Sequence, residues 1–105
     1  MKIYNKLIRD KIPEIMDAKG VSYEVRELSD EEYIEKLNEK LQEELDEFLS
    51  AKPEDQVEEL ADLVELVYAI LANKGVTIDE FEAVRLQKQE KRGGFEQKLL
   101  LEWAD

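Results

Sequence analysis

Two residue types with versatile side-chain chemistry are missing from this chain. Its 105 residues include no cysteine and no histidine. The first absence excludes disulfides and thiolate nucleophiles, and the second excludes imidazole acid–base catalysis. Together they exclude most zinc sites. Any metal ion would therefore have oxygen ligands, which favours magnesium, manganese or calcium.

Long apolar segments are also scarce. The N-terminal sequence MKIYNKLIRDKIPE lacks the continuous apolar core of a signal peptide. The most apolar stretch, residues 60–72, is too short and too charged to cross a bilayer. We therefore expect a cytoplasmic protein.

The charge balance limits the partners of the chain. It has 27 acidic and 15 basic residues and a net charge of −12, which argues against a nucleic-acid polymer or an anionic membrane as partner. A polyphosphate ligand would need local basic groups or metal ions. The length predicts one domain over residues 1–105, of a size that oligomerisation often stabilises.

Proline, glycine and capping residues mark the boundaries of the expected helices. A short helix should begin at Pro13 and end at Gly20. The pairs Ser29/Glu32 and Thr77/Glu80 have the spacing of capping boxes. Further breaks fall at residues 51–53, Gly75 and Gly93–Gly94. The expected longer helices are residues 30–50, 53–74 and 78–92.

The pattern predicts an all-α fold with a minor β element. The two longest helices should form an antiparallel hairpin around residue 52, and additional helices complete a four-helix-type core. Residues 60–72 are apolar nearly all round, so we expect dimerisation to complete that core. Residues 21–28 alternate like a strand, and the tail 95–105 is expected to be a strand or an extended arm pairing with them.

Two acidic pairs stand on or beside the apolar faces of the expected hairpin. Glu44 and Glu47 precede its turn, and Glu59 and Asp62 follow it. A carboxylate held against an apolar face must be ion-paired, hydrogen-bonded or bound to a metal. Helical geometry places the two pairs opposite each other. From the residues alone, a divalent-cation site and a set of salt-bridged structural acids are equally favoured.

The acidic residues and the segments around them resemble a known family. The arrangement Glu43-Glu44-x-x-Glu47, followed by Glu59-x-x-Asp62, resembles the signature of the all-α nucleotide pyrophosphohydrolases of the MazG-like superfamily. The segments YNKLIRDKIPEI and KRGGFEQKLLL are similar to its phosphoribosyl-ATP pyrophosphohydrolase-like branch, so the resemblance covers nearly the whole chain. One departure is the short spacing of eleven residues between Glu47 and Glu59, which a tight hairpin accommodates.

The resemblance implies hydrolysis of a nucleoside triphosphate, or a related nucleotide, to a monophosphate and pyrophosphate, with nucleotide-pool house-cleaning as one role. It implies that Glu44, Glu47, Glu59 and Asp62 bind Mg²⁺, with Mn²⁺ as an alternative. Glu43 would act as a general base through water or support the ligands, or it is a plain surface acid. The alternatives are a phosphoribosyl-ATP pyrophosphohydrolase of histidine biosynthesis and a non-catalytic helical interaction module. A homodimer or homotetramer is expected.

Two groups of basic residues are candidates for phosphate binding. In the N-terminal group, Arg9 and Lys11 are favoured. On the last expected helix, Arg85, Lys88 and Arg92 share one face. The resemblance supports Lys88 and Arg92 most, and the alternative for all of them is surface ion pairing.

Three aromatic side chains are candidates for stacking on a nucleobase: Phe95, Tyr68 and Trp103. Aromatic residues at such positions are more often part of a core or an interface. The sequence does not separate the three.

Overall fold

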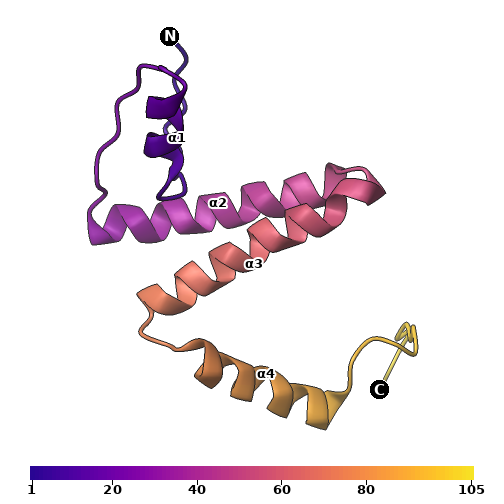
Figure 1. The fold of residues 1–105 in the computed structure, drawn as a ribbon. Helices are drawn as coiled ribbons and strands as arrows, with labels where there is room; N and C mark the ends of the chain where they lie inside the picture. The colour runs from indigo at the N-terminus through magenta and orange to yellow at the C-terminus, as the bar shows by residue number, and fades with distance from the viewer. The chain divides into compact units, whose positions relative to one another are not determined.

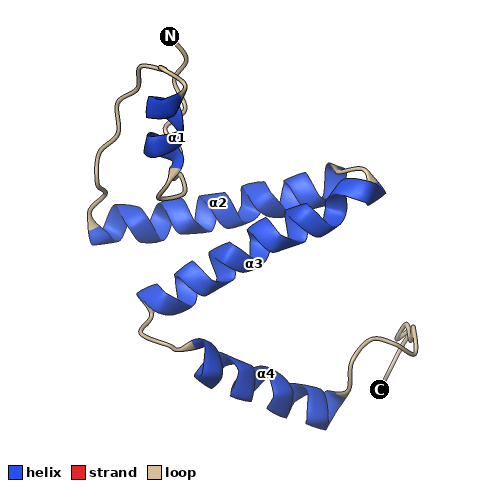
Figure 2. Cartoon of the chain, viewed as in Figure 1, coloured by secondary structure: helices blue, strands red, loops and turns tan.

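Helices joined by loops make up the chain in the computed structural model, which describes residues 1–105 (Figure 2). The helices are α1 (Ile12–Ala18), α2 (Asp30–Ser50), α3 (Gln56–Asn73) and α4 (Ile78–Arg92), with a 3₁₀ turn at Pro53–Asp55. The expected all-α class is confirmed, whereas the four-helix core formed on dimerisation stays a prediction. None of the helices combines the length and the hydropathy needed to cross a membrane.

The chain divides into two compact units. The N-terminal unit, Met1–Ile70, contains α1, α2 and most of α3. The C-terminal unit, Leu71–Asp105, contains the end of α3, all of α4 and the tail. The candidate acidic residues belong to the first unit, and the candidate cations of α4 belong to the second.

The helix ends follow the local signals in the sequence. Gly20 and Gly75 adopt φ values of 70° and 74° just after α1 and α3, a conformation that favours glycine. Beyond them, the N–H of Val21 and the N–H of Val76 each bond a carbonyl of the preceding helix at 3.0 Å. These bonds complete Schellman motifs, which satisfy carbonyl groups at the helix ends.

The start of α2 is held by the predicted capping box. The Ser29 side chain accepts a hydrogen bond from the Glu32 backbone, and the Glu32 side chain accepts one from the Ser29 backbone. Arg26 adds two hydrogen bonds to the Glu32 carboxylate, at 3.2 and 2.7 Å. The Arg26 and Ser29 bonds lower the pKa of Glu32 to about 2.

Helices α2 and α3 form the antiparallel hairpin that positions the acidic residues (Figure 1). The chain leaves α2 in an extended conformation at Ala51 and Lys52, and Pro53 then opens the short 3₁₀ turn. Leu37 and Leu66 are the buried apolar residues of the chain, and Glu44 is buried with an exposed fraction of only 6%. This small core therefore contains a carboxylate.

The minor β element is not formed, which corrects the expectation for residues 21–28 and for the tail. No residue of the chain lies in a strand (Figure 2). A strand needs a ladder partner as well as alternation, and neither segment has one. Tyr23 lies close to Asp17 of α1 instead, and hydrogen bonding with that carboxylate raises the pKa of Tyr23. The alternation of residues 21–28 thus corresponds to an extended connection between α1 and α2.

Candidate metal centre and phosphate-binding pocket

Three of the four candidate metal ligands converge across the hairpin. Glu44 comes from α2, and Glu59 and Asp62 come from the first two turns of α3. One carboxylate oxygen of each residue lies within 4.8 Å of the other two. The tight turn at residues 51–53 brings these acids together although fourteen residues separate Glu44 from Glu59.

Glu47 borders this cluster without being one of its three members. It is exposed near the C-terminal end of α2. Burial is the largest cause of the raised pKa of Glu44, and the neighbouring Glu47 carboxylate adds to it. Desolvation likewise raises the pKa of Glu59, with further contributions from Glu47 and Asp62. Four carboxylates are therefore crowded at one place.

Two oxygen atoms in the cluster lack any hydrogen-bond partner. They are Oε2 of Glu44 and Oε2 of Glu59, and both are buried. The nearest basic group to Glu44 is Lys40, whose Nζ lies 3.6 Å from the other carboxylate oxygen, Oε1. A buried acceptor without a partner costs about 1–3 kcal/mol, and more when it is charged. The residues of this cluster are therefore incompletely neutralised by the protein.

The donor set fits a hard divalent cation. All three groups offer carboxylate oxygens, the ligands that Mg²⁺, Mn²⁺ and Ca²⁺ prefer. Metal–oxygen distances of about 2.1–2.6 Å place opposite ligands roughly 4–5 Å apart. The separation of the oxygens within the cluster is compatible with one such ion. No hydrogen-bond donor of the protein competes for the two unpartnered oxygens.

The N-terminal basic segment lies against this acidic region. The Arg9 guanidinium donates a hydrogen bond to Oδ1 of Asp62 at 2.6 Å, and Lys6 donates one to Oε1 of Glu43 at 2.8 Å. The Lys36 side chain also donates to the Asn5 carbonyl, at 3.3 Å. The first two contacts place the cationic side chains of Arg9 and Lys6 beside the cluster. The sequence predicted neither ion pair.

The ion pair with Lys6 changes what Glu43 can do. The hydrogen bond from Lys6 is the main cause of the lowered pKa of Glu43, and the same bond raises the pKa of Lys6. A carboxylate with a lowered pKa is a weaker general base. Lys11, by contrast, is exposed at the start of α1 and forms no ion pair.

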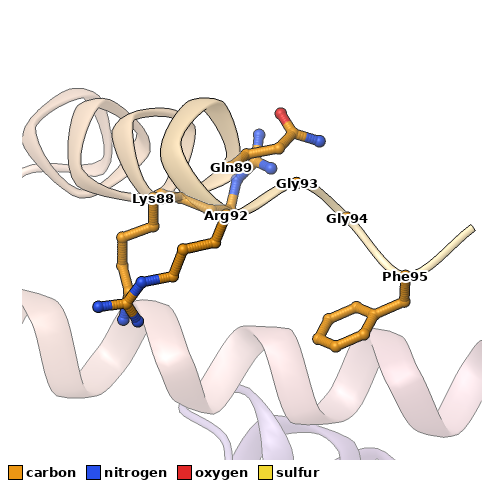
Figure 3. A pocket seen from close by; sticks show the side chains of 7 residues that line it. Lys88, Gln89, Arg92, Gly93, Gly94 and Phe95 are labelled. Carbon is orange, nitrogen blue, oxygen red and sulfur yellow. The ribbon is translucent and has the colours of Figure 1, made fainter. Parts of the chain in front are cut away.

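A separate, cationic pocket lies within the C-terminal unit. Its volume is about 560 Å³, and its lining is drawn in Figure 3. The lining residues come from the last two turns of α4 and the segment after it: Arg85, Lys88, Gln89, Arg92, Gly93, Gly94 and Phe95. All three basic residues that the sequence placed on one face therefore line a single pocket.

The three cations of this pocket differ in their neighbours. Arg85 is held by Glu82, with its Nη2 atom 2.6 Å from a carboxylate oxygen. Lys88 and Arg92 form no ion pair, and their side chains extend to the same side of α4 (Figure 3). Gln89 points to the opposite side (Figure 3). Lys88 and Arg92 are therefore the available anion-binding groups of this pocket.

The structure also separates the three candidate aromatic residues. Phe95 lines the pocket with Lys88 and Arg92, whereas Tyr68 and Trp103 do not. In the local sequence, Phe95 is distinguished by its position two residues after Gly93 and by its spacing of seven residues from Lys88.

Comparison with known protein families gives one match. The family model described as phosphoribosyl-ATP pyrophosphohydrolase matches residues 1–89. No match was found among curated proteins or among solved structures. The matched segment contains the whole acidic cluster and ends within α4, before Arg92 and Phe95.

Proposed function

The chain belongs to the phosphoribosyl-ATP pyrophosphohydrolase family, and on this premise we propose that it cleaves a nucleoside triphosphate, or a related nucleotide, between the α- and β-phosphates. The products are a nucleoside monophosphate and pyrophosphate. Membership of the family makes the chain a nucleotide pyrophosphohydrolase, a hydrolase that acts on phosphoric anhydrides. The finer proposal concerns its substrate, its metal and the residues that bind them, within a single domain over residues 1–105.

The buried, unpartnered oxygens of Glu44 and Glu59 are the observation that carries this proposal. A purely structural set of acids would be expected to have each buried oxygen paired. Together with Asp62, and with Glu47 at the border, these residues would hold Mg²⁺ or Mn²⁺. The chemistry that such an ion supplies is neutralisation of phosphate charge and activation of a water nucleophile.

The side chains around the cluster have supporting roles in this proposal. Arg9 pairs with Asp62 at an exposed position, so its guanidinium would be accessible to a substrate phosphate as an alternative partner. Lys6 holds Glu43 ionised and in place. Glu43 then orients groups beside the cluster by hydrogen bonding rather than accepting a proton.

The unpaired cations of α4 bind substrate phosphate. Lys88 and Arg92 have no protein carboxylate to compete for them, whereas Arg85 is engaged by Glu82 and contributes less. Lys11 is exposed and is the weakest candidate of the set. Arginine and lysine are the residues that most often contact phosphate oxygens in proteins.

Two substrates are supported equally. The name of the family indicates phosphoribosyl-ATP, which would place the chain in histidine biosynthesis. A canonical or damaged nucleoside triphosphate, which would indicate nucleotide-pool house-cleaning, presents the same phosphoanhydride to the same residues. The cluster acts on the phosphates, so the acidic residues do not select between them.

A cytoplasmic homodimer or homotetramer is the proposed assembly. The hairpin leaves large apolar side chains exposed on both helices, among them Leu49, Val57 and Val64. A second copy would cover such a surface, as in four-helix bundles. A chain without cysteine also has no disulfide that requires an oxidising compartment.

The proposed reaction is tested by measuring pyrophosphate release from nucleoside and deoxynucleoside triphosphates and from phosphoribosyl-ATP, with saturating Mg²⁺ and with EDTA. We expect release that requires the divalent cation and yields the monophosphate as co-product. Rapid turnover of one substrate class would identify the branch. If no nucleotide in the panel is cleaved, the proposal is wrong and a helical interaction module becomes the better account.

A further inference from the structure

The pocket of the C-terminal unit combines two unpaired cations with one aromatic ring. We propose that it is a nucleotide subsite in which Phe95 stacks on the nucleobase while Lys88 and Arg92 bind phosphate. This inference rests on the proposed function and adds to it a residue for base recognition. The family match ends at residue 89 and assigns nothing to Phe95.

The position of Phe95 depends on the backbone at Gly93. Gly93 has φ 79° and ψ −178°, a combination that is essentially restricted to glycine. The helix therefore ends abruptly at Arg92, and the chain turns so that the Phe95 ring lies on the same side as Lys88 and Arg92 (Figure 3). In a continued helix residue 95 would also fall on the face of Lys88, at i+7, so the turn at Gly93 changes the course of the chain rather than the side on which the ring lies.

The ring is available for stacking. The exposed fraction of Phe95 is 99%, so both of its faces are free of protein contacts. A fully exposed phenylalanine gains free energy when another apolar or aromatic surface covers it. Within the pocket, the covering group must also be compatible with two unpaired cations a few residues away.

A nucleotide meets both requirements at once. Its phosphates are complementary to Lys88 and Arg92, and its base offers a planar π-face to Phe95. The volume of about 560 Å³ lies in the usual range for small-molecule pockets, about 300–1,000 Å³. No acidic residue lines the pocket, so nothing within it opposes an anionic ligand.

Stacking alone gives affinity for a base without selecting its identity, because every base has a π-face. The one amide of the pocket, Gln89, points to the other side of α4 (Figure 3). The subsite is therefore expected to raise affinity for nucleotides over inorganic polyphosphates, with little preference among bases.

The test is calorimetric binding to the full-length chain in Mg²⁺. The two probes are α,β-methylene-ATP, whose bridging carbon blocks hydrolysis of the bond, and inorganic tripolyphosphate, which has no base. We expect Phe95→Ala to weaken binding of the nucleotide by roughly 5- to 150-fold, the range for loss of one base–aromatic stack. Tripolyphosphate binding should be unchanged. Phe95→Trp should preserve nucleotide binding, and Lys88→Ala should weaken both probes.

Two glycine substitutions provide a matched control for the backbone argument. A Cβ at Gly93 or at Gly94 would meet no atom within 4 Å, but only Gly93 has a φ in the left-handed region. Gly93→Ala should therefore redirect Phe95 and reproduce the selective loss of nucleotide affinity. Gly94→Ala should bind both probes like the wild type.

Several results would overturn the inference: no binding of the nucleotide by the wild type, an unchanged affinity in Phe95→Ala, or equal losses for the two probes. These results are distinct from failure of the proposed function. If the wild type releases pyrophosphate and Phe95→Ala leaves the Michaelis constant unaltered, the proposed function stands and the subsite is wrong. If the chain binds the nucleotide through Phe95 but cleaves no substrate, the subsite stands and the proposed function is wrong.

Discussion

The two units of the chain carry very different charge. Of the 27 acidic residues, 20 lie in the N-terminal unit with nine of the 15 basic residues, so that unit has a net charge of −11. The C-terminal unit has seven acidic and six basic residues and a net charge of −1. The overall charge of −12 is thus almost entirely a property of one region. The other region is close to neutral and contains the unpaired Lys88 and Arg92.

The units also differ in how their charged groups are held. In the N-terminal unit, Glu44 is buried, and Arg9 and Lys6 neutralise neighbouring acids. In the C-terminal unit no residue of α4 is buried, and the cations of the pocket stand at the surface. A buried charge lowers stability, so its presence indicates a functional role. A surface charge indicates a function only when it lines a pocket with other functional groups.

The comparison is tested most severely by removing one charge from the acidic cluster. Glu59→Gln should reduce pyrophosphate release by at least about 100-fold, because loss of groups that merely support metal ligands already costs 10- to 100-fold. The measurement is steady-state hydrolysis in saturating Mg²⁺. Glu58→Gln is the matched control, since Glu58 is exposed and outside the cluster. Equal activity in the two variants would remove Glu59 from the site.

Removing one charge from the cationic pocket should have a smaller effect. Lys88→Ala is expected to lower kcat/KM by about 10- to 150-fold, which corresponds to one hydrogen bond to a charged group. Lys91→Ala is the control, because Lys91 is also exposed on α4 but does not line the pocket. Arg85→Ala should lie between them, since Glu82 already engages Arg85. If Lys91→Ala and Lys88→Ala behave alike, only the general charge of α4 matters.

The buried charge of the N-terminal unit should also affect stability. Glu44→Gln removes a buried charge, so we expect the metal-free protein to gain about 1–2 kcal/mol. Added Mg²⁺ should stabilise the wild type through its preference for the folded state and should stabilise the variant much less. Urea unfolding with and without Mg²⁺ measures both effects. Glu35→Gln, an exposed change on the same helix, should leave both quantities unchanged. A Glu44→Gln variant that is less stable and still responds to Mg²⁺ would contradict a metal site here.

The sequence predicted the features that depend on neighbouring residues. The capping box at Ser29 and the glycine ends at Gly20 and Gly75 are set within one or two helical turns, and the structure confirms them. The hairpin followed from the short break before Pro53 and from the apolar faces on either side of it. The metal-binding roles of the acids that this hairpin brings together remain predictions.

The features that the sequence did not predict depend on distant residues or on the exact course of the backbone. Arg9 and Asp62 are 53 positions apart, so no local pattern links them. Residues 21–28 alternate like a strand, but a ladder partner is not a local property. Phe95 was not separated from Tyr68 and Trp103, because the pocket that it lines is formed by the end of α4 and the segment after it, which no sequence pattern shows.

The smallest expected effect concerns an acid of the N-terminal unit whose pKa is shifted in the opposite direction from that of Glu44. Hydrogen bonds from Arg26 and Ser29 lower the pKa of Glu32 from the ordinary value of 4.5 to about 2. A lowered folded-state pKa means that the ionised form stabilises the folded protein. This contribution is complete above pH 4.5 and is lost as the pH falls towards 2. Because both partners are exposed, the change in Tm should be a few degrees at most.

Glu32→Gln should therefore melt slightly below the wild type at pH 7, and the difference should shrink between pH 4.5 and 2. Arg26→Gln removes the largest cause of the shift, so most of the pH dependence contributed by Glu32 should disappear in that variant. Thermal unfolding by circular dichroism across this pH range gives the comparison. A difference between Glu32→Gln and the wild type that stays constant from pH 7 to 2 would mean that the Glu32 side chain stabilises α2 through packing. In that case the ionisation of Glu32 at the start of α2 would not affect the free energy of unfolding. Only the crowded acids around Glu44 would then make stability depend on ionisation.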